Sequence, residues 1–231
     1  MQRLGDSRIW TEDAIEPEEG EPFVPTYTYD GAGRLVGAQR PELNLSRTYS
    51  FAATGGCGPA TGAGKTTNRT TAIRNGITTT YCYDHADRLV STTDPLFATI
   101  AYDARGNTTT LGTQMLAYDG GDRHVATQVG NTNVRYLRDA TDRIVERKLN
   151  GVTVARFGFS GPGDSSSLTM NVSGVVTGRT IGLLGGTVVT KQTTGDRWSY
   201  PNIHGDVAPV ADATGAKVGA THTYDPDGNA L

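Results

Sequence analysis

The chain has 231 residues, of which 30 are glycine, 36% are hydrophobic and 7% are aromatic, and its formal net charge is −3. This charge does not favour a nucleic acid or an anionic membrane as the main partner, and no apolar run approaches the roughly 20 residues that span a bilayer. Abundant Gly and Thr, with few of the residues that fill helices, indicate strands and turns, in one large β domain or two small ones.

The first 25 residues are predicted to be an irregular segment. Residues 12–25 are acidic and contain proline, and residues 1–6 lack the apolar stretch of a signal peptide. We therefore expect the signal of an exported protein to lie upstream of this chain. A β array is predicted from residue 26 to residue 231, and it begins with a strand at 26–29, in which Tyr27 and Tyr29 share one face.

A short motif recurs along this array. In each copy an aromatic strand end is followed by Asp, two small or polar residues, Gly or Asp, and then Arg or Asn before the next strand. Its positions are Tyr29, Asp30, Gly33, Arg34; Tyr83, Asp84, Asp87, Arg88; Tyr102, Asp103, Gly106, Asn107; Tyr118, Asp119, Asp122, Arg123; Asp139, Asp142, Arg143, with Arg138 in the Tyr place; and Tyr224, Asp225, Gly228, Asn229. Residues 212–218 contain a weaker relative.

Each residue type in the motif suits a turn. Asp favours the first turn position because its carboxylate accepts backbone N–H bonds. Gly three residues later supplies the positive φ that closes a bulged hairpin loop, and Asp tolerates this conformation next best. Arg or Asn then pairs with the Asp or with a neighbouring carbonyl. The motif therefore predicts repeated antiparallel hairpins, and we interpret its residues as structural.

The spacing of the copies agrees with hairpins. The aligned positions 83, 102, 118 and 138 are 19, 16 and 20 residues apart, and each step is the length of two short strands with two turns. Asn75-Gly76 and Asn150-Gly151 are strong signals for two-residue hairpin turns. Between the copies, 52–67 is predicted to be a surface loop, 160–167 a turn region, and 169–190 short strands with glycine kinks.

Cys57 and Cys82 lie 25 residues apart and leave two interpretations. They form a disulfide that ties the 52–67 loop to the strand at 81–83, which we favour if the protein is exported, or they are two unrelated buried thiols. One pair is too few for a zinc site by itself.

No cofactor, metal or catalytic site is predicted. Residues 58–66 imitate a phosphate loop, but Pro59 stands where that pattern requires Gly, and neither a leading strand nor a following helix is indicated. The histidines at 85, 124, 204 and 222 have no ligand-like spacing. The Asp and Tyr residues are many and equivalent, whereas catalysis needs a unique, convergent set, so we predict a protein that is not an enzyme.

The Tyr-Asp-x-x-Gly-Arg copies resemble the YD repeats of Rhs proteins, wall-associated proteins, Tc toxin C components and teneurins. The resemblance covers about 27–229, and residues 200–229 look like the repeat that precedes the Rhs-associated core. It implies an all-β fold of repeated antiparallel β-hairpins in a curved spiral sheet, which in the family closes as a hollow shell. A chain of this length makes only a few turns of such a spiral, so we expect a partial, open sheet whose edges pair with further sequence.

The resemblance also implies a function. The first hypothesis is a non-catalytic structural segment of a secreted or cell-surface YD/Rhs shell that encloses a C-terminal toxin. Its partners would be the remaining YD repeats, the core of the full-length protein and the enclosed toxin segment, with no nucleic acid and no membrane span. The alternative is a cell-surface adhesion or carbohydrate-binding module that contacts a surface glycan or another protein.

Overall fold

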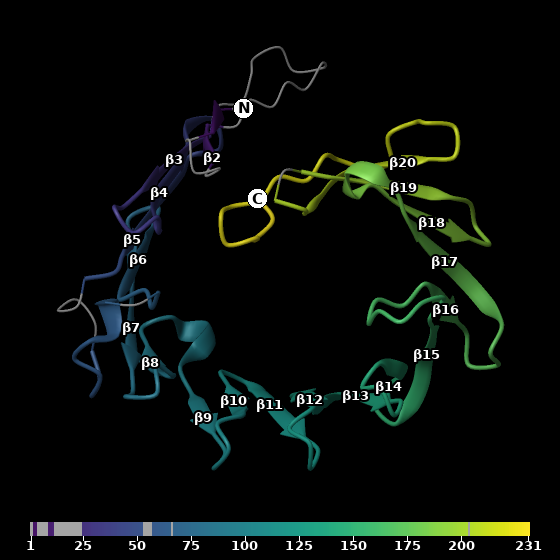
Figure 1. Cartoon of the computed structure of the whole chain (residues 1–231), viewed down its shortest axis with the longest axis horizontal. Coiled ribbons are helices and arrows are strands. Elements are labelled where there is room, and N and C mark those ends of the chain that lie inside the picture. Colours follow the sequence, from purple (N-terminus) through teal and green to yellow (C-terminus); the bar gives the residue numbers. More distant parts are fainter. Residues whose placement is uncertain (1, 4–8, 12–24, 53–56, 66, 203) are drawn as a thin grey trace. The chain divides into compact units, whose positions relative to one another are not determined.

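The computed structural model describes residues 2–3, 9–11, 25–52, 57–65, 67–202 and 204–231, and within these residues the chain is built of β-strands with a few single turns of 3-10 helix. Figure 1 shows this all-β architecture. The chain divides into two compact units, Met1–Ala101 with Thr110–Thr113 and Tyr102–Thr109 with Gln114–Leu231, and each unit is described by itself. No helix in the described part is both long and apolar enough to cross a membrane.

The first sheet has eight strands, hydrogen-bonded in chain order. Its strands are β1 (Gln2–Arg3), β2 (Ile9–Thr11), β3 (Thr26–Tyr29), β4 (Leu35–Arg40), β5 (Leu45–Ser50), β6 (Thr71–Arg74), β7 (Ile77–Tyr83) and β8 (Leu89–Thr92). The 3-10 turns that accompany them are η1 (Pro41–Leu43), η2 (Ala63–Lys65) and η3 (Pro95–Phe97).

The second sheet has twelve strands, which also follow one another in chain order. They are β9 (Ile100–Tyr102), β10 (Thr108–Leu111), β11 (Gln114–Tyr118), β12 (His124–Val129), β13 (Thr132–Arg138), β14 (Ile144–Leu149), β15 (Val152–Gly158), β16 (Leu168–Met170), β17 (Val176–Gly182), β18 (Val188–Gln192), β19 (Arg197–Pro201) and β20 (Val207–Asp212), with η4 (Leu184–Gly186) between β17 and β18. Both sheets are open, with different strands at their two ends, so neither closes into a barrel.

Two-residue turns set the register of two hairpins. Asn75 and Gly76 have φ values of 49° and 83°, and Asn150 and Gly151 have 48° and 84°. Two successive residues with positive φ match the right-handed twist of the flanking strands. The pairing follows directly, because the residues that flank each turn, Arg74 with Ile77 and Leu149 with Val152, are register partners.

Apolar side chains are buried mainly in the first unit. Its buried hydrophobic residues are Tyr27, Ala38, Leu45, Tyr49, Ala63, Ala72, Cys82 and Tyr83, whereas the described part of the second unit buries Ala155, Val189 and Ala211. Many larger apolar side chains of the second unit stay exposed, among them Met115, Val152 and Leu184. This unit is therefore held largely by backbone pairing and turn contacts rather than by a deep core.

Two segments predicted to be irregular contain more order than local sequence indicates. The segment 1–25 lies mostly outside the described residues, but the described part contains β1 and β2, which pair with each other. The loop 52–67, of which 53–56 and 66 lie outside the described residues, carries η2 and a parallel bridge from Cys57 to Cys82. In both places the order comes from pairing with another segment rather than from an alternating pattern.

Candidate functional site

The aspartate turns have one shared geometry, which the turn at Asp30 illustrates. Its backbone N–H donates to the carbonyl of Arg34 at 3.0 Å, and its own carbonyl accepts from Gly33 N–H at 3.0 Å. Its Oδ1 accepts from the backbone N–H groups of Ala32 and Arg34, at 3.0 and 2.9 Å, and its Oδ2 accepts from Arg34 Nε at 2.8 Å. One carboxylate thus satisfies three donors and fixes a five-residue turn.

The same backbone and Oδ1 hydrogen bonds recur at nine places in the described residues. They begin at Asp30, Asp84, Asp103, Asp119, Asp139, Asn171, Asn202, Asp212 and Asp225. The structure therefore brings Asp and the fifth residue together at every assigned turn. It adds two turns that the sequence analysis did not assign, at Asn171 and Asn202.

The fourth residue of every such turn has a positive φ. These residues are Gly33 (81°), Asp87 (60°), Gly106 (94°), Asp122 (62°), Asp142 (71°), Gly174 (82°), Gly205 (94°), Gly215 (87°) and Gly228 (82°). Glycine adopts this conformation without penalty, and Asp is among the residues that tolerate it best. The Gly-or-Asp alternation in the motif thus has a single backbone cause.

The fifth residue usually binds the turn carboxylate through its side chain. Arg88 approaches Asp84 Oδ2 at 2.7 Å from both Nε and Nη2, and Asn107 donates to Asp103 Oδ2 at 2.9 Å. At Asn202 the roles are exchanged, since its amide Nδ2 donates to Asp206 Oδ2 at 3.2 Å. The pairing therefore depends on one donor and one acceptor, whichever end of the turn supplies them.

These hydrogen bonds stabilise the charged form of the turn carboxylates. The side-chain hydrogen bond from Arg123, helped by that residue's backbone N–H, lowers the pKa of Asp119 to about 2. The side-chain hydrogen bond from Thr141 leads the causes that lower the pKa of Asp139 to about 2. The pKa is lowered in the same direction at Asp30, Asp84, Asp103 and Asp212. A carboxylate that accepts several hydrogen bonds is harder to protonate, so the turns favour ionised aspartates.

Neighbouring turns of the second unit also bind one another. Asp122 Oδ1 accepts from Asn107 Nδ2 at 2.8 Å and pairs with Arg105 Nε at 2.7 Å. Asp142 Oδ1 lies 3.6 Å from Arg123 Nη1. In both cases the Asp at the positive-φ position reaches the preceding turn. The sequence signal for this link is Asp in place of Gly at the fourth position, where Asp has a side-chain contact in addition to tolerating the positive φ.

The residues in the Tyr position have different contacts. Tyr83 is buried and its hydroxyl donates to the Arg69 carbonyl at 2.8 Å, and Tyr224 donates to the Val207 carbonyl at 2.7 Å. Tyr118 packs its ring edge-on against His124 with centroids 5.7 Å apart. Tyr29 and Tyr102 are half-buried. Arg138, in the Tyr place, instead donates from Nη1 to the Asp142 carbonyl at 2.8 Å.

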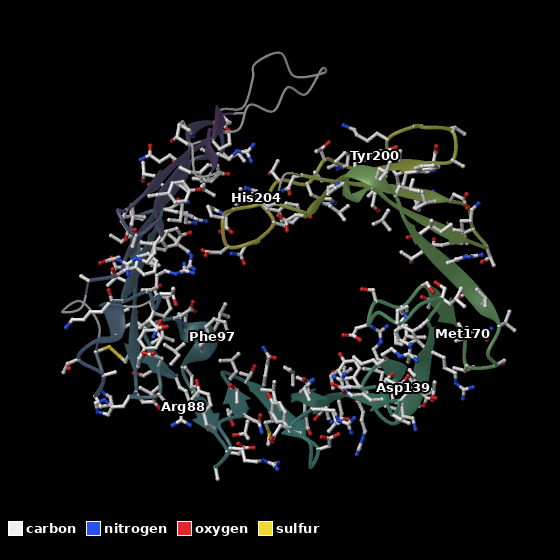
Figure 2. All side chains as sticks on the ribbon, in the orientation of Figure 1. Arg88, Phe97, Asp139, Met170, Tyr200 and His204 are labelled. Atoms are coloured by element: carbon white, nitrogen blue, oxygen red, sulfur yellow. A yellow bond between two sulfur atoms is a disulfide. The ribbon has the colours of Figure 1, made fainter. Side chains whose placement is uncertain are left out.

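The predicted cysteine pair is joined by a disulfide, seen as a yellow bond in Figure 2, with Cα atoms 4.3 Å apart. Here residues 57–60 continue along the edge of β7 beyond the end of β6. Tyr83 N–H donates to the Cys57 carbonyl and Ala60 N–H donates to the Tyr83 carbonyl, both at 3.1 Å. The described residues 58–65 of the segment that imitates a phosphate loop therefore form this edge contact and η2, and the next described regular element is the strand β6.

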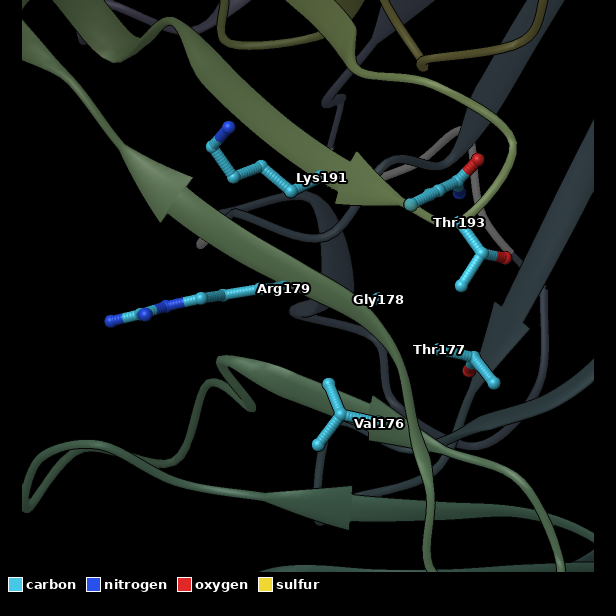
Figure 3. Close-up of a pocket in the computed structure, with 7 residues that line it drawn as sticks. Val176, Thr177, Gly178, Arg179, Lys191 and Thr193 are labelled. Carbon is cyan, nitrogen blue, oxygen red and sulfur yellow. The ribbon is translucent and has the colours of Figure 1, made fainter.

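Metal binding is not indicated among the residues that the structure describes. No group of three or more His, Cys, Asp or Glu side chains in that part of the chain is arranged to hold a metal ion. An open groove of about 250 Å³ lies on β17 and β18, where Arg179 and Lys191 are register partners and point to the same side (Figure 3). Lys191 pairs with Asp196 at 2.9 Å, and no carboxylate, histidine or cysteine is among the groove-lining residues.

Comparison with known proteins gives a likeness in structure. No protein-family model matches the sequence, and no curated protein matches it. The structure of TcdB2-TccC3 without its hypervariable C-terminal region matches with a TM-score of 0.58 and 17% identity, over 99% of this chain and 14% of that chain. The chain has a YD/Rhs-like fold.

Two further structures support the YD/Rhs-like fold. TcdB2-TccC3-TEV has a TM-score of 0.53 and 14% identity, and TcdB2-TccC3-Cdc42 has 0.52 and 15%; each match covers 97% of this chain and 14% of that chain. The chain therefore spans about one seventh of the length of these chains. At such identities the likeness is one of fold, and it agrees with the all-β hairpin array that the repeat motif predicts.

Proposed function

We propose that the chain is a non-catalytic wall segment of a larger, exported YD/Rhs-type shell, and that this shell encloses a toxic C-terminal segment of the same protein. The observation that carries the proposal is the second sheet, whose twelve strands include only three buried hydrophobic residues among those described. A sheet of this kind presents a large surface and has little hydrophobic core. It suits a wall that separates two compartments.

The repeated turns support the same role. They use equivalent residues at every step, and their hydrogen bonds are directed at backbone groups of the turn itself. Such an arrangement repeats a structural unit, as in other repeat proteins in which each unit is stabilised by its neighbours. In this proposal, further hairpins of the full-length protein pair beyond β1 at one end and beyond residues 217–222, which already hydrogen-bond to β20, at the other.

The likeness to TcdB2-TccC3 agrees with a wall segment. Nearly the whole of this chain matches, and the match covers about 14% of those longer chains, as expected for one part of a larger array. In this proposal the wall works by exclusion. It keeps the enclosed polypeptide away from proteases and other proteins until release, and it needs no catalytic group of its own.

Protease protection of the full-length protein tests the proposal. The C-terminal segment should resist a protease when it is part of the native full-length protein. The same segment expressed alone should be digested. A control with a cleavable site on an exposed turn, such as residues 160–167, should be cut without exposing the C-terminal segment. Equal digestion of the segment inside and outside the full-length protein would refute enclosure, and saturable binding of a defined glycan would favour the adhesion alternative.

A further inference from the structure

The two cysteines of the disulfide differ in solvent exposure. Cys57 is exposed, whereas Cys82 is buried at 8% exposure. Thiol–disulfide exchange requires a thiolate to reach one of the two sulfurs, so access decides which sulfur is attacked. Cys57 is therefore the more exposed of the two bonded residues, and we infer that its sulfur is the one that a thiolate reaches.

The segment that carries Cys57 is fitted closely against β7. A side chain at Gly58, which has φ of 88°, would bring its Cβ to 2.8 Å from the Tyr83 carbonyl oxygen. On the described residues the segment makes two backbone hydrogen bonds to Tyr83, and the Gly64 carbonyl accepts from Arg34 Nη1 at 3.2 Å. The disulfide is the one covalent connection between this loop and β7.

The segment occupies a strand-pairing position. The hydrogen bond from Tyr81 N–H to the Thr70 carbonyl is the last backbone one between β7 and the β6 side in the described residues. Further along the same edge of β7, the backbone of Tyr83 hydrogen-bonds to Cys57 and Ala60 instead. On its other edge β7 pairs with β8, where Tyr83 is the register partner of Leu89. Removing the segment would therefore leave the N–H and carbonyl of Tyr83 on an open strand edge.

We propose that the Cys57 sulfur is a site of thiol–disulfide exchange with dithiol reductants, and that exchange there releases residues 57–60 from the edge of β7 while both sheets stay folded. The disulfide then acts as a latch that is closed in an oxidising compartment and opens in a reducing one. This inference does not depend on what the shell encloses.

The reaction balances with a dithiol as reductant. One reductant thiolate attacks Cys57 Sγ, a mixed disulfide forms, the Cys57–Cys82 bond breaks, and its electron pair leaves on Cys82 Sγ, which takes a proton. The second reductant thiolate attacks the reductant sulfur of the mixed disulfide and displaces the Cys57 thiolate, which is also protonated. Two electrons pass from the dithiol, which is oxidised to a disulfide, to the protein disulfide, which becomes two thiols.

A trapping experiment tests the attacked sulfur. The oxidised full chain is treated briefly with glutathione, a monothiol, in native buffer, and free thiols are then alkylated and mapped by mass spectrometry. We expect glutathione on Cys57 and the alkyl group on Cys82, in excess of the opposite arrangement by about tenfold or more, because access controls the attack. Equal or preferential labelling of Cys82 by glutathione would overturn the assignment, as would reaction only in denaturant.

Hydrogen exchange tests the latch. After reduction by dithiothreitol, the amides of Ala60 and Tyr83 should lose protection, while those of β13 and β14 keep theirs. Cys57→Ser should reproduce the reduced pattern without any reductant. Unchanged protection at Ala60 and Tyr83 would refute release, and loss of protection throughout both sheets would show unfolding rather than a local latch.

Discussion

Asn107 donates a hydrogen bond from Nδ2 to Asp122 Oδ1 at 2.8 Å, and this contact joins one aspartate turn to the next along the chain. Asp122 has φ of 62°, so it occupies a backbone conformation that favours glycine while also carrying the acceptor for its neighbour. Asp122 therefore destabilises the fold through its backbone conformation and stabilises it through its side-chain contacts. Substitutions can separate these two effects.

Replacing Asp122 should show that the backbone conformation affects stability more than the side-chain contacts do. Asp122→Ala should lower the free energy of unfolding by about 1 kcal/mol more than Asp122→Gly does, because a Cβ is disfavoured at positive φ. Both variants lose the exposed contacts to Asn107 and Arg105, which are worth about 0–1 kcal/mol. Urea denaturation measures the difference, and equal stability of the two variants would contradict it.

Acid should weaken the fold through the turn carboxylates. The pKa of Asp119 is lowered to about 2 in the folded protein, below the unfolded value of about 3.9. Its contribution is therefore complete above about pH 4 and is lost as the pH falls towards about 2. Asp119→Asn, which keeps an Oδ1 acceptor as Asn171 does, should show a shallower loss of stability over this window. Identical pH profiles from denaturation titrations would count against this role.

The packing of the loop 57–65 can be tested by substituting two of its glycines, Gly62 and Gly64. A Cβ on Gly64 would meet the backbone of Ala52 and Phe51, whereas a Cβ on Gly62 would meet nothing within 4 Å. Gly64→Ala should therefore cost about 1–3 kcal/mol of stability, and Gly62→Ala should change it by less than about 0.5 kcal/mol. Thermal unfolding of the oxidised proteins gives both values, and a harmless Gly64→Ala would show that the loop does not pack as described.

The buried hydroxyl of Tyr83 should matter more than an exposed one. Tyr83→Phe removes the donor to the Arg69 carbonyl and should lower the free energy of unfolding by about 1–2 kcal/mol. Tyr200→Phe is the matched control, because Tyr200 is 40% exposed, and its effect should stay below about 0.5 kcal/mol. Chemical denaturation compares the two, and similar small effects would argue against a structural hydroxyl at Tyr83.

The local chemistry of the turns was predictable from sequence, but the contacts between turns were not. Asp at position one and Gly or Asp at position four already indicate the turn, since each residue type satisfies a local backbone demand. The turns at Asn171 and Asn202 lack the Tyr-Asp pair that marks the motif, although an asparagine Oδ1 accepts the same two backbone hydrogen bonds. The Asn107–Asp122 contact depends on the strand register, which spacing alone does not fix.

Sequence pattern was also insufficient for order that arises when one short segment pairs with another. The strand β1 has two residues and no alternating pattern of its own, so its conformation follows from its partner β2. The bridge from Cys57 to Cys82 has the same origin. The sequence left one large domain or two small ones open, and the repeat motif does not place the boundary between the two units because it is the same in both.

The strand order of the two sheets has a consequence for biosynthesis. Because hydrogen-bonded neighbours are also neighbours in the sequence, contact order is low for an all-β protein, and a low contact order favours fast folding. Each hairpin can dock on the preceding one as it leaves the ribosome, without waiting for distant residues. Evolution can likewise lengthen or shorten such a chain by whole hairpins, since an inserted unit meets the same kind of neighbour on either side.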